Sequence, residues 1–385
     1  DDDTIFLNPD ILRDIQAGRC VRTVYTTAGD AGGENWPGRE LGAEAAYAQM
    51  AGVANQWTTS DADVAGHPIR LRTLVAAPHI SLVFLRLPDG LNDGSGSTRF
   101  GNQSIQRLRD GALAAIDAID GSTTYTRAQL TASLAALMAG FTPTTVRTQD
   151  YLFGAGDNSD HVTTGLFVAD ADPAYSSPHT LTFYLGYGTH DRPQNLFGDD
   201  LTEKQAAFLA YGQVAGGPIG DGWTDAMVKR DYITDSRSTG NLARGASVTA
   251  SAQNTGTGQT ADRAIDGYAV GSPIDATHEW ATGGAGSGSW IQVDFGAPTQ
   301  VNGVALADRP NAADQITAGT LEFSDGSTVS TGPLPNRGSM RVLSFPTRTV
   351  TSVRLRIDAT SPTTTDVGLA EFEVYGNLGG GATTV

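Results

Sequence analysis

Apolar side chains in the first 235 residues alternate between the spacing of a helix and that of a buried strand. Leu7, Ile11 and Ile15 recur at every fourth position and predict a short helix that ends at Gly18. The clearest strand covers residues 79–87 (HISLVFLRL), because apolar residues fill it and the turn Pro88-Asp89-Gly90 closes it.

Further strands and helices are expected to alternate along this part of the chain. Strands are predicted at residues 20–27, 144–148 and 180–185, and helices at 39–53, 104–119, 127–138 after the N-cap Thr126, and 204–214 after a capping box at 200–203. The alternation predicts an α/β, Rossmann-like domain whose mostly parallel sheet is covered by helices. In such a sheet, ligands bind at the carboxyl ends of the strands.

The pattern changes at residues 234–240 (TDSRSTG), a small polar stretch that is typical of a linker. Beyond it, short strand-like runs are separated by turns that contain glycine or proline, at 247–250, 290–295, 301–306, 320–323, 341–345, 353–357 and 370–375. This half therefore predicts an all-β sandwich. The expected division is a first domain at 1–235, a linker at 236–240, the sandwich at 241–377 and a flexible tail at 378–385.

Charge and cysteine content narrow the classes of function. The chain has 25 Lys and Arg against 42 Asp and Glu, a net charge of -17, so its surface repels nucleic acid and anionic membranes. Membrane insertion is not expected, because no apolar run approaches the roughly 20 residues that a spanning helix needs. The single cysteine, Cys20, excludes an intramolecular disulfide, and its place at a strand start predicts a buried, inert thiol.

Two groups of residues are candidates for chemistry in the first half. Asp1-Asp2-Asp3 directly precedes the first helix, and Ser159-Asp160-His161 follows a glycine-containing loop. Adjacent carboxylates repel one another, so they favour solvent, a helix N-terminus or a cation. Helix capping is the plainer interpretation, and spacing alone does not bring the two groups together.

The motifs at these positions resemble a known family. Residues 1–9 (DDDTIFLNP) look like the continuation of the His-x-Asp-Asp motif of PIG-L/LmbE-like zinc-dependent de-N-acetylases, and residues 28–53 look like that family's second stretch. Ser159-Asp160-His161 resembles its later His-x-Asp-His motif. The resemblance covers about the first 235 residues and implies a metal-dependent amide hydrolase that acts on N-acetylated sugars.

The resemblance also implies catalytic roles. Asp1 matches the general base, while Asp2 and His161 match a carboxylate and an imidazole ligand of zinc. Asp160 would shape its loop or orient a histidine. The family's first histidine would lie two residues before Asp1, and a catalytic zinc takes three protein ligands, so we expect the natural polypeptide to extend upstream with a further strand.

Three further residues are candidates for substrate binding. Arg39 matches an arginine that contacts a sugar hydroxyl or an anionic group; the alternative is an ion pair with Glu44. Asn158 stands where the family usually has the first histidine of His-x-Asp-His, and it can donate a hydrogen bond but cannot act as an acid. His190 lies in a loop after a predicted strand, either near the site or at the surface.

The second half resembles discoidin domains, the coagulation-factor C-type, galactose-binding-like jelly rolls. The matching motifs are Asn241-Leu-Ala-Arg-Gly-Ala, Ala264-Ile-Asp-Gly267, Trp290-Ile-Gln-Val-Asp-Phe-Gly296 and Glu371-Phe-Glu-Val-Tyr-Gly376. The resemblance implies sugar binding by loops at one end, and a structural calcium ion with Asp266 and Glu371 as ligands. Backbone carbonyls near Arg263 and Thr277 would complete its six to eight oxygens; the alternative is a turn without metal.

The remaining loop and tryptophan residues of this half have plainer expected roles. Trp280 and Trp290 are expected in the sandwich core. Tyr268, His278 and Arg309 lie in predicted loops where a ligand could reach them, although Asp308-Arg309-Pro310 favours a surface turn.

Together these features predict a secreted, extracellular, zinc-dependent hydrolase that removes N-acetyl groups from an N-acetylhexosamine-containing glycan, to which the carbohydrate-binding sandwich holds it. One alternative is a non-catalytic glycan-binding or adhesive protein on a deacetylase scaffold, which Asn158 favours. Another is an amide hydrolase of a small glycosylated metabolite. The oligomeric state stays open.

Overall fold

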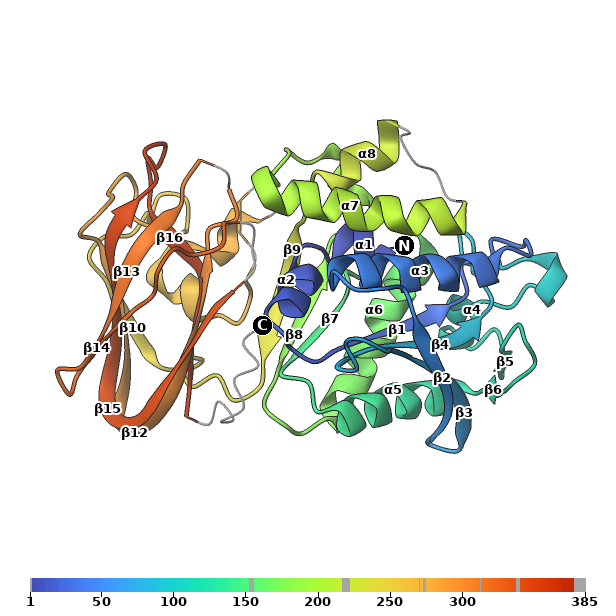
Figure 1. Cartoon of the computed structure of the whole chain (residues 1–385). Helices are drawn as coiled ribbons and strands as arrows, with labels where there is room; N and C mark the ends of the chain where they lie inside the picture. Colours follow the sequence, from blue (N-terminus) through green and yellow to red (C-terminus); the bar gives the residue numbers. More distant parts are fainter. Residues whose placement is uncertain are drawn as a thin grey trace. The chain divides into compact units, whose positions relative to one another are not determined.

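The chain divides into two compact units, which are described separately. The computed structural model describes residues 2–151, 156–216, 222–269, 271–272, 275–311, 313–336 and 340–376. The first unit comprises Asp1–Pro143, Arg147–Ser177 and Phe183–Asp231, and the second comprises Thr144–Val146, Pro178–Thr182 and Tyr232–Val385. Figure 1 colours the chain from blue at its N-terminus to red at its C-terminus.

The first unit contains a four-stranded mixed sheet. Its strands are β1 (Val21–Thr27), β4 (Ile80–Leu87), β3 (His67–Leu74) and β2 (Trp57–Val64), in the order β1-β4-β3-β2. The strand predicted at residues 79–87 is confirmed as β4, which pairs in parallel with β1. Strands β2 and β3 form an antiparallel hairpin that the sequence pattern did not indicate, because most side chains of β2 are exposed and polar.

A second sheet contains β7 (Thr145–Gln149), β8 (Thr180–Tyr184) and β9 (Ile233–Ser238), in that order. Strand β9 includes residues 236–238, so part of the predicted linker is sheet instead. The physical reason is burial, since Asp235 and Ser236 are 0% and 1% exposed despite their polarity. The other domain boundaries stay predictions.

Helices of the first unit pack against its four-stranded sheet. In Figure 1, α3 (Trp36–Met50) and α7 (Gly198–Ala215) lie together above the strands of the first unit, and α5 (Arg127–Phe141) lies below them. The predicted N-cap of α5 is confirmed, because Thr126 and Gln129 form a capping box. The remaining helices are α1 (Asp2–Phe6), α2 (Asp10–Gln16), α4 (Ile105–Arg109), α6 (Ser159–Ala171), α8 (Gly222–Val228) and the short 3-10 turns η1 (Thr98–Phe100), η2 (Asp172–Ala174), η3 (Tyr187–Asp191), η4 (Ala261–Ile265) and η5 (Ala276–His278).

Three helix predictions differ from the structure. The helix expected to end at Gly18 is two helices, α1 and α2, on either side of Pro9, which lacks a backbone N–H. The helix expected at 104–119 stops at Arg109, close to Gly111 in the left-handed region (φ +79°), and the hairpin β5 (Ile116–Asp117) and β6 (Thr124–Tyr125) follows. Helix α7 begins at Gly198, so residues 200–203 lie inside it and do not cap it.

The Cys20 prediction was wrong. The cysteine is exposed, since β1 begins at the next residue and leaves Cys20 outside the sheet. Within the described residues, no helix is both long and apolar enough to cross a membrane.

The second unit contains the antiparallel β-sandwich that the strand pattern predicts. Its strands are β10 (Ser247–Ala250), β11 (Trp280–Ala281), β12 (Trp290–Asp308), β13 (Ile316–Phe323), β14 (Thr328–Ser330), β15 (Arg341–Thr360) and β16 (Gly368–Tyr375). They pair in the order β11-β16-β12-β15-β13-β14, and β10 pairs with β12. Four of the predicted runs join into the long strands β12 and β15. The register between these two strands shifts between Asp294 and Thr299 of β12.

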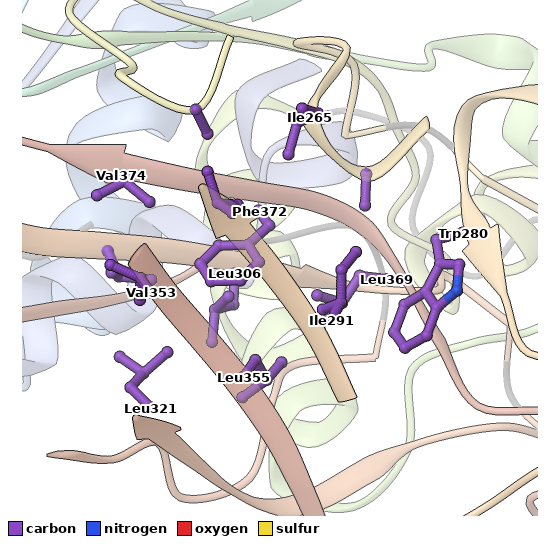
Figure 2. Close-up of a cluster of buried hydrophobic side chains, with 14 of the residues drawn as sticks. Ile265, Trp280, Ile291, Leu306, Leu321, Val353, Leu355, Leu369, Phe372 and Val374 are labelled. Atoms are coloured by element: carbon purple, nitrogen blue, oxygen red, sulfur yellow. The ribbon is translucent and has the colours of Figure 1, made fainter. Parts of the chain in front are cut away.

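Apolar side chains from these strands meet in one core. Figure 2 shows Leu306, Leu355 and Phe372 pointing toward one another, and each is 0% exposed. Trp280 is also 0% exposed and donates its indole N–H to the Ala252 carbonyl at 2.8 Å.

The prediction that Trp290 belongs to the core was wrong. It is only half-buried, and the Arg354 guanidinium lies 4.3 Å from the centre of its ring. The strand alternates faces at this point, so the next residue, Ile291, points inward and is 0% exposed.

These two tryptophans provide a matched test of the core. Trp280→Ala should lower the free energy of unfolding of the sandwich by about 3–5 kcal/mol, because it leaves a cavity and removes a buried hydrogen bond. Trp290→Ala should cost less than about half of that, since its side chain lies on the outer face. Urea denaturation followed by circular dichroism measures both, and equal losses would contradict the assignment of faces.

Candidate functional site

Two side chains that are far apart in the sequence, Asp2 and His161, come together in the first unit. Asp2 opens helix α1, and His161 lies in the first turn of helix α6. Asp2 Oδ1 lies 3.1 Å from His161 Nε2. The His161 side chain is 6% exposed and that of Asp2 is 44% exposed, so the pair opens toward solvent on the aspartate side.

A second carboxylate holds the other nitrogen of the imidazole. Asp157 Oδ1 lies 2.9 Å from His161 Nδ1, and the same oxygen accepts the backbone N–H groups of Asn158 and Tyr187. The rings of Phe6 and Tyr187 meet the imidazole edge-on, with centroids 5.6 and 4.9 Å away. These contacts fix the ring so that Nε2 faces Asp2.

The charges in this cluster stabilise one another. Burial alone would lower the pKa of His161, but the negative charges of Asp2 and Asp157 outweigh it and raise that pKa to about 10. Burial would raise the pKa of Asp2, but the positive charge of the imidazolium acts against it and holds that pKa well below its usual range.

The sequence analysis missed Asp157. It precedes His161 by four positions, the spacing at which side chains at the start of a helix face each other. That spacing is the signal that could have identified it.

Asp160 bonds to the loop that follows strand β4. Its Oδ2 accepts the Gly90 N–H at 3.0 Å, so of its two expected roles this contact suits the shaping of the loop. Burial, and then the charge of nearby Asp89, raise the pKa of Asp160 to about 7.

Asn158 is the N-cap of helix α6. Its Oδ1 accepts the Asp160 backbone N–H at 2.8 Å, and its Nδ2 donates to Asn92 Oδ1 at 3.3 Å. The residue predicted to bind substrate therefore also starts the helix that carries His161.

The carboxyl ends of the parallel strands β1 and β4 lie beside this cluster, where the sheet topology predicts ligand binding. Two loop carboxylates join these ends, since Asp30 Oδ1 accepts the Asp89 N–H at 2.9 Å and Asp89 Oδ2 accepts the Ala31 N–H at 3.2 Å. Sequence reasoning treated Asp89 as a turn residue and did not single out Asp30.

Arg39 lines a pocket of about 70 Å³ together with Asp2, Tyr25, Thr27, Glu40 and Arg86. The alternative for Arg39, an ion pair with Glu44, is not the arrangement found: Glu44 Oε1 instead pairs with Arg72 Nε at 2.6 Å. The positive charge of Arg39 acts on Asp2 and Asp89. Its position suits the predicted contact with substrate.

The other residues of the opening motif have different positions. Asp1, the predicted base, lies outside the described residues. Asp3 is buried and accepts the hydroxyl groups of Tyr25 and Tyr47 at 2.8 and 2.9 Å, which anchors the start of α1 over β1 and α3. His190 lies in η3, where its Nδ1 is 3.1 Å from Asp191 Oδ1 and its side chain is 40% exposed, which suits the surface alternative.

In the sandwich, the two predicted calcium ligands, Asp266 and Glu371, are near enough for their charges to interact. Glu371 is 0% exposed and its Oε2 accepts the Gly267 N–H at 3.2 Å. Asp266 Oδ1 accepts the Tyr268 N–H at 3.1 Å, and its Oδ2 lies 2.8 Å from His278 Nδ1. Burial raises the pKa of both carboxyl groups, and for Glu371 the charges of Glu373 and Asp266 add to the effect.

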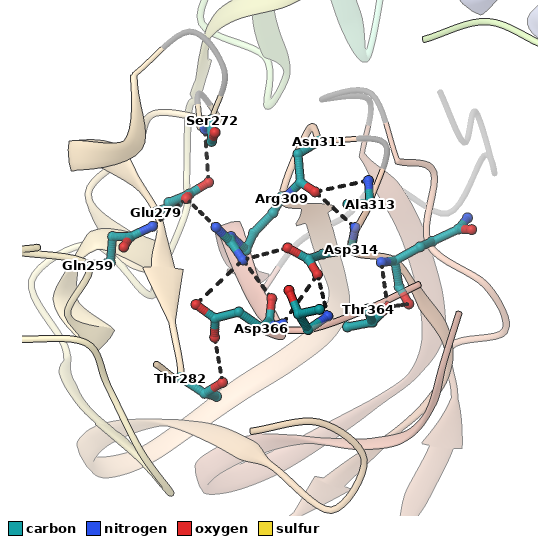
Figure 3. Close-up of polar contacts among 12 residues, drawn as sticks. Gln259, Ser272, Glu279, Thr282, Arg309, Asn311, Ala313, Asp314, Thr364 and Asp366 are labelled. Carbon is teal, nitrogen blue, oxygen red and sulfur yellow. Dashed lines mark hydrogen bonds and ion pairs between the residues drawn. The ribbon is translucent and has the colours of Figure 1, made fainter. Parts of the chain in front are cut away.

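Arg309 is not in a surface turn, contrary to the prediction. Its side chain is 8% exposed and joins loops at one end of the sandwich (Figure 3). Its guanidinium lies 2.9 Å from Glu279 Oε1 and 3.1 Å from Asp314 Oδ2, and it donates to the Asp366 carbonyl at 2.6 Å. Two carboxylates and a backbone carbonyl from three loops therefore hold it inside.

Among the described residues, no group of three or more His, Cys, Asp and Glu side chains is arranged to hold a metal ion. Asp2 and His161 are thus a pair of candidate ligands in this part of the chain. The same holds for Asp266 and Glu371.

Comparison with known families identifies the first part of the chain. The family model described as GlcNAc-PI de-N-acetylase, PIG-L, matches residues 1–171. Residues 1–171 carry a PIG-L domain. The expected resemblance to this family is therefore confirmed for residues 1–171, and the described part of this PIG-L domain contains both Asp2 and His161.

A domain of unknown function, DUF7402, matches residues 241–375. Solved structures similar to this half include chitosan-binding module 1 of a chitosanase/glucanase from Paenibacillus sp. IK-5, with 29% identity, a TM-score of 0.29 and coverage of 35% of this chain and 98% of that one. Another is the Clostridium perfringens module CpGH89CBM32-5 in complex with GalNAc-beta-1,3-galactose, with 22% identity, a TM-score of 0.30 and coverage of 35% and 99%. A search of curated proteins finds no match.

The contact between Asp160 and Gly90 can be tested by adding one methyl group. A Cβ at Gly90 would lie 2.5 Å from Asp160 Oδ1, so Gly90→Ala should destabilise the PIG-L domain by about 1–3 kcal/mol through overpacking. Gly140→Ala is the control, because a Cβ there meets nothing within 4 Å and alanine favours the helix. Thermal denaturation compares them, and an unchanged Gly90→Ala variant would show that Asp160 is not packed against this loop.

Proposed function

We propose that this protein is a secreted, zinc-dependent hydrolase that removes N-acetyl groups from an N-acetylhexosamine-containing glycan. The observation that carries the proposal is the approach of Asp2 and His161 to 3.1 Å within a PIG-L domain. A carboxylate oxygen and an imidazole nitrogen at this separation can share one divalent ion. The activity for which the matching family is named, de-N-acetylation of GlcNAc-PI, supports the reaction class.

The donor set fits zinc at two positions. Zinc in hydrolases takes nitrogen and oxygen ligands from three side chains and keeps an open position. Its histidine ligands generally donate their second ring nitrogen to a carboxylate, which is the arrangement of His161 and Asp157. The family resemblance assigns the third ligand to a histidine before Asp1.

The family resemblance supports a role for Asp1, and the positions of Asp2, His161 and Arg39 support roles for these three residues. Bound zinc would lower the pKa of a water molecule and polarise the acetamide carbonyl. Asp1 would take the proton of that water, and Asp2 and His161 would hold the ion. Arg39 would orient a sugar hydroxyl or an anionic group from the wall of the adjoining pocket.

The second candidate function is a non-catalytic glycan-binding or adhesive protein. Asn158 favours it, because its amide cannot protonate a leaving amine and its Oδ1 already caps helix α6. In the catalytic proposal, the leaving group must therefore receive its proton from water or from another side chain.

The sandwich is proposed to hold the enzyme on its glycan and to bind a structural calcium ion. The sequence resemblance to discoidin domains supports sugar binding, and an extracellular location follows from the same reasoning. Asp266 and Glu371 fit two of the oxygen ligands, because calcium prefers carboxylates and each oxygen keeps a lone pair beside its present hydrogen bond.

Acetate release tests the catalytic proposal. The zinc-loaded protein should release acetate from N-acetylglucosamine oligomers, and a chelator should stop the reaction. Asp2→Asn and His161→Ala should each lower the rate at least about 100-fold, because they remove proposed metal ligands. Asp61→Asn is the control, since Asp61 is 64% exposed on strand β2 and pairs with Arg70. A protein that binds glycans, does not bind zinc and releases no acetate would support the non-catalytic candidate.

Calcium binding can be measured independently of catalysis. Calcium should raise the melting temperature of the sandwich, because an ion that binds only the folded state stabilises it. Asp266→Asn should abolish this rise. Asp325→Asn, which removes one charge from the turn between β13 and β14, should keep it. If calcium does not alter the wild-type melting curve, His278 is the lasting partner of Asp266 and the turn has no metal.

A further inference from the structure

The pocket beside Asp2 has an apolar part, to which three elements contribute. Tyr25 of β1 and Phe84 of β4 both line it, and they are partners in the register of these two strands. Their rings stack, with centroids 5.1 Å apart and planes at 9°. Ala43 of α3 lines the same pocket. Two stacked rings and an alanine methyl group therefore provide apolar surface within this pocket.

Charged side chains complete the lining. Glu40 and Arg86 are bonded to each other, since Arg86 Nε and Nη2 donate to the two Glu40 oxygens at 2.6 and 2.8 Å. Asp2, which approaches His161 to 3.1 Å, is a further member of the lining. The pocket thus adjoins the proposed metal ligands and offers both apolar and polar surface.

Small side chains keep this space open. Ala28, Gly29 and Ala43 all line the pocket and have at most one side-chain carbon each. Ala43 is 2% exposed, so its methyl group is enclosed by its neighbours. Because protein interiors are closely packed, a larger side chain at position 43 would take up volume that is now part of the pocket.

The volume of the pocket limits what can enter it. The pocket measures about 70 Å³. An apolar cavity of about 150 Å³ holds one benzene molecule, so half of that volume holds about three non-hydrogen atoms. An acetyl group has this number of atoms, whereas a pyranose ring has about twice as many before its substituents are counted. The pocket therefore suits one small substituent of a sugar, and the sugar ring is too large for it.

We propose that this pocket receives the acyl part of the substrate's N-acetyl group, and that Ala43 sets the largest acyl group that can enter. This inference rests on the proposed de-N-acetylase function and names the part of the substrate that the pocket selects. The acetyl methyl group would contact the rings of Tyr25 and Phe84, and the sugar ring would stay outside the pocket. Longer N-acyl groups should therefore be poor substrates.

A series of acyl lengths tests this specificity. The substrates are glucosamine trimers with N-formyl, N-acetyl or N-propionyl groups, and kcat/KM is measured with zinc-loaded protein. Wild type should prefer the acetyl over the propionyl compound by about tenfold or more. Ala43→Val should lower kcat/KM about tenfold or more for the acetyl compound but less than about threefold for the formyl compound, because valine fills the space of the acetyl methyl group. Ala43→Gly should raise the ratio of propionyl to acetyl hydrolysis about tenfold.

Ala48→Val is the matched control. Ala48 is also 2% exposed on α3, but it lies beyond Arg39, Glu40 and Ala43, the α3 residues of the described chain that line the pocket. This variant should suffer similar overpacking and a similar loss of melting temperature, while the ratios among the three substrates stay as in wild type.

A binding measurement separates the pocket from the reaction. The full-length protein is treated with a chelator and mixed with an N-acetylglucosamine trimer that carries ¹³C in its acetyl methyl groups. An NMR nuclear Overhauser effect should connect a labelled methyl group to the Phe84 ring, disappear in Ala43→Val and persist in Ala48→Val.

The outcomes distinguish the two proposals. If wild type releases no acetate, the proposed function fails, while the methyl contact with Phe84 still tests the pocket. The assignment of the pocket would be overturned by a complex in which sugar ring protons contact Phe84 instead of the methyl group. It would also be overturned by an active enzyme in which Ala43→Val lowers formyl and acetyl hydrolysis equally.

Discussion

The geometry of the first unit depends on one imidazole held between two carboxylates. His161 and Asp157 are buried, and a buried charge is costly unless a partner and hydrogen bonds compensate it. The contact with Asp157 fixes the ring inside the protein, and the contact with Asp2 directs its free edge to the start of α1. Since these helices come from distant parts of the sequence, the packing of α1, α6 and η3 has to be right before the two side chains can meet.

Four consecutive residues at the start of α6 have several different roles, and these roles compete. Asn158 starts the helix by capping it, Asp160 ties the helix to the loop after β4, and His161 enters the charged cluster. An N-cap of this type stabilises a helix by about 1 kcal/mol, and asparagine is among the best residues for it. The departure from the family's histidine at position 158 therefore has a local structural benefit, whatever its effect on the acid step.

Elements with a regular period could be predicted from the sequence, and elements defined by their neighbours could not. Strand β4 is apolar throughout, and Thr126 begins α5 with a capping box, so both could be identified. Strand β2 is polar on both faces, so no period reveals it. In the site, the motifs pointed to Asp2 and His161, but the links among Asp30, Asp89 and the strand ends exist only through tertiary packing.

In this acidic chain, arginines compensate the carboxylates of permanent clusters, whereas histidines contact the carboxylates of the candidate sites. With 42 acidic and 25 basic residues, buried arginines serve more than one carboxylate, as Arg86 does for Glu40 and Asp120, and Arg309 for Glu279 and Asp314. Arginine stays charged, so these clusters are permanent. Histidine lies between Asp2 and Asp157, and another contacts Asp266. Imidazole, unlike guanidinium, can give up its proton and become a ligand, so these two clusters are the ones in which we propose that a metal ion binds.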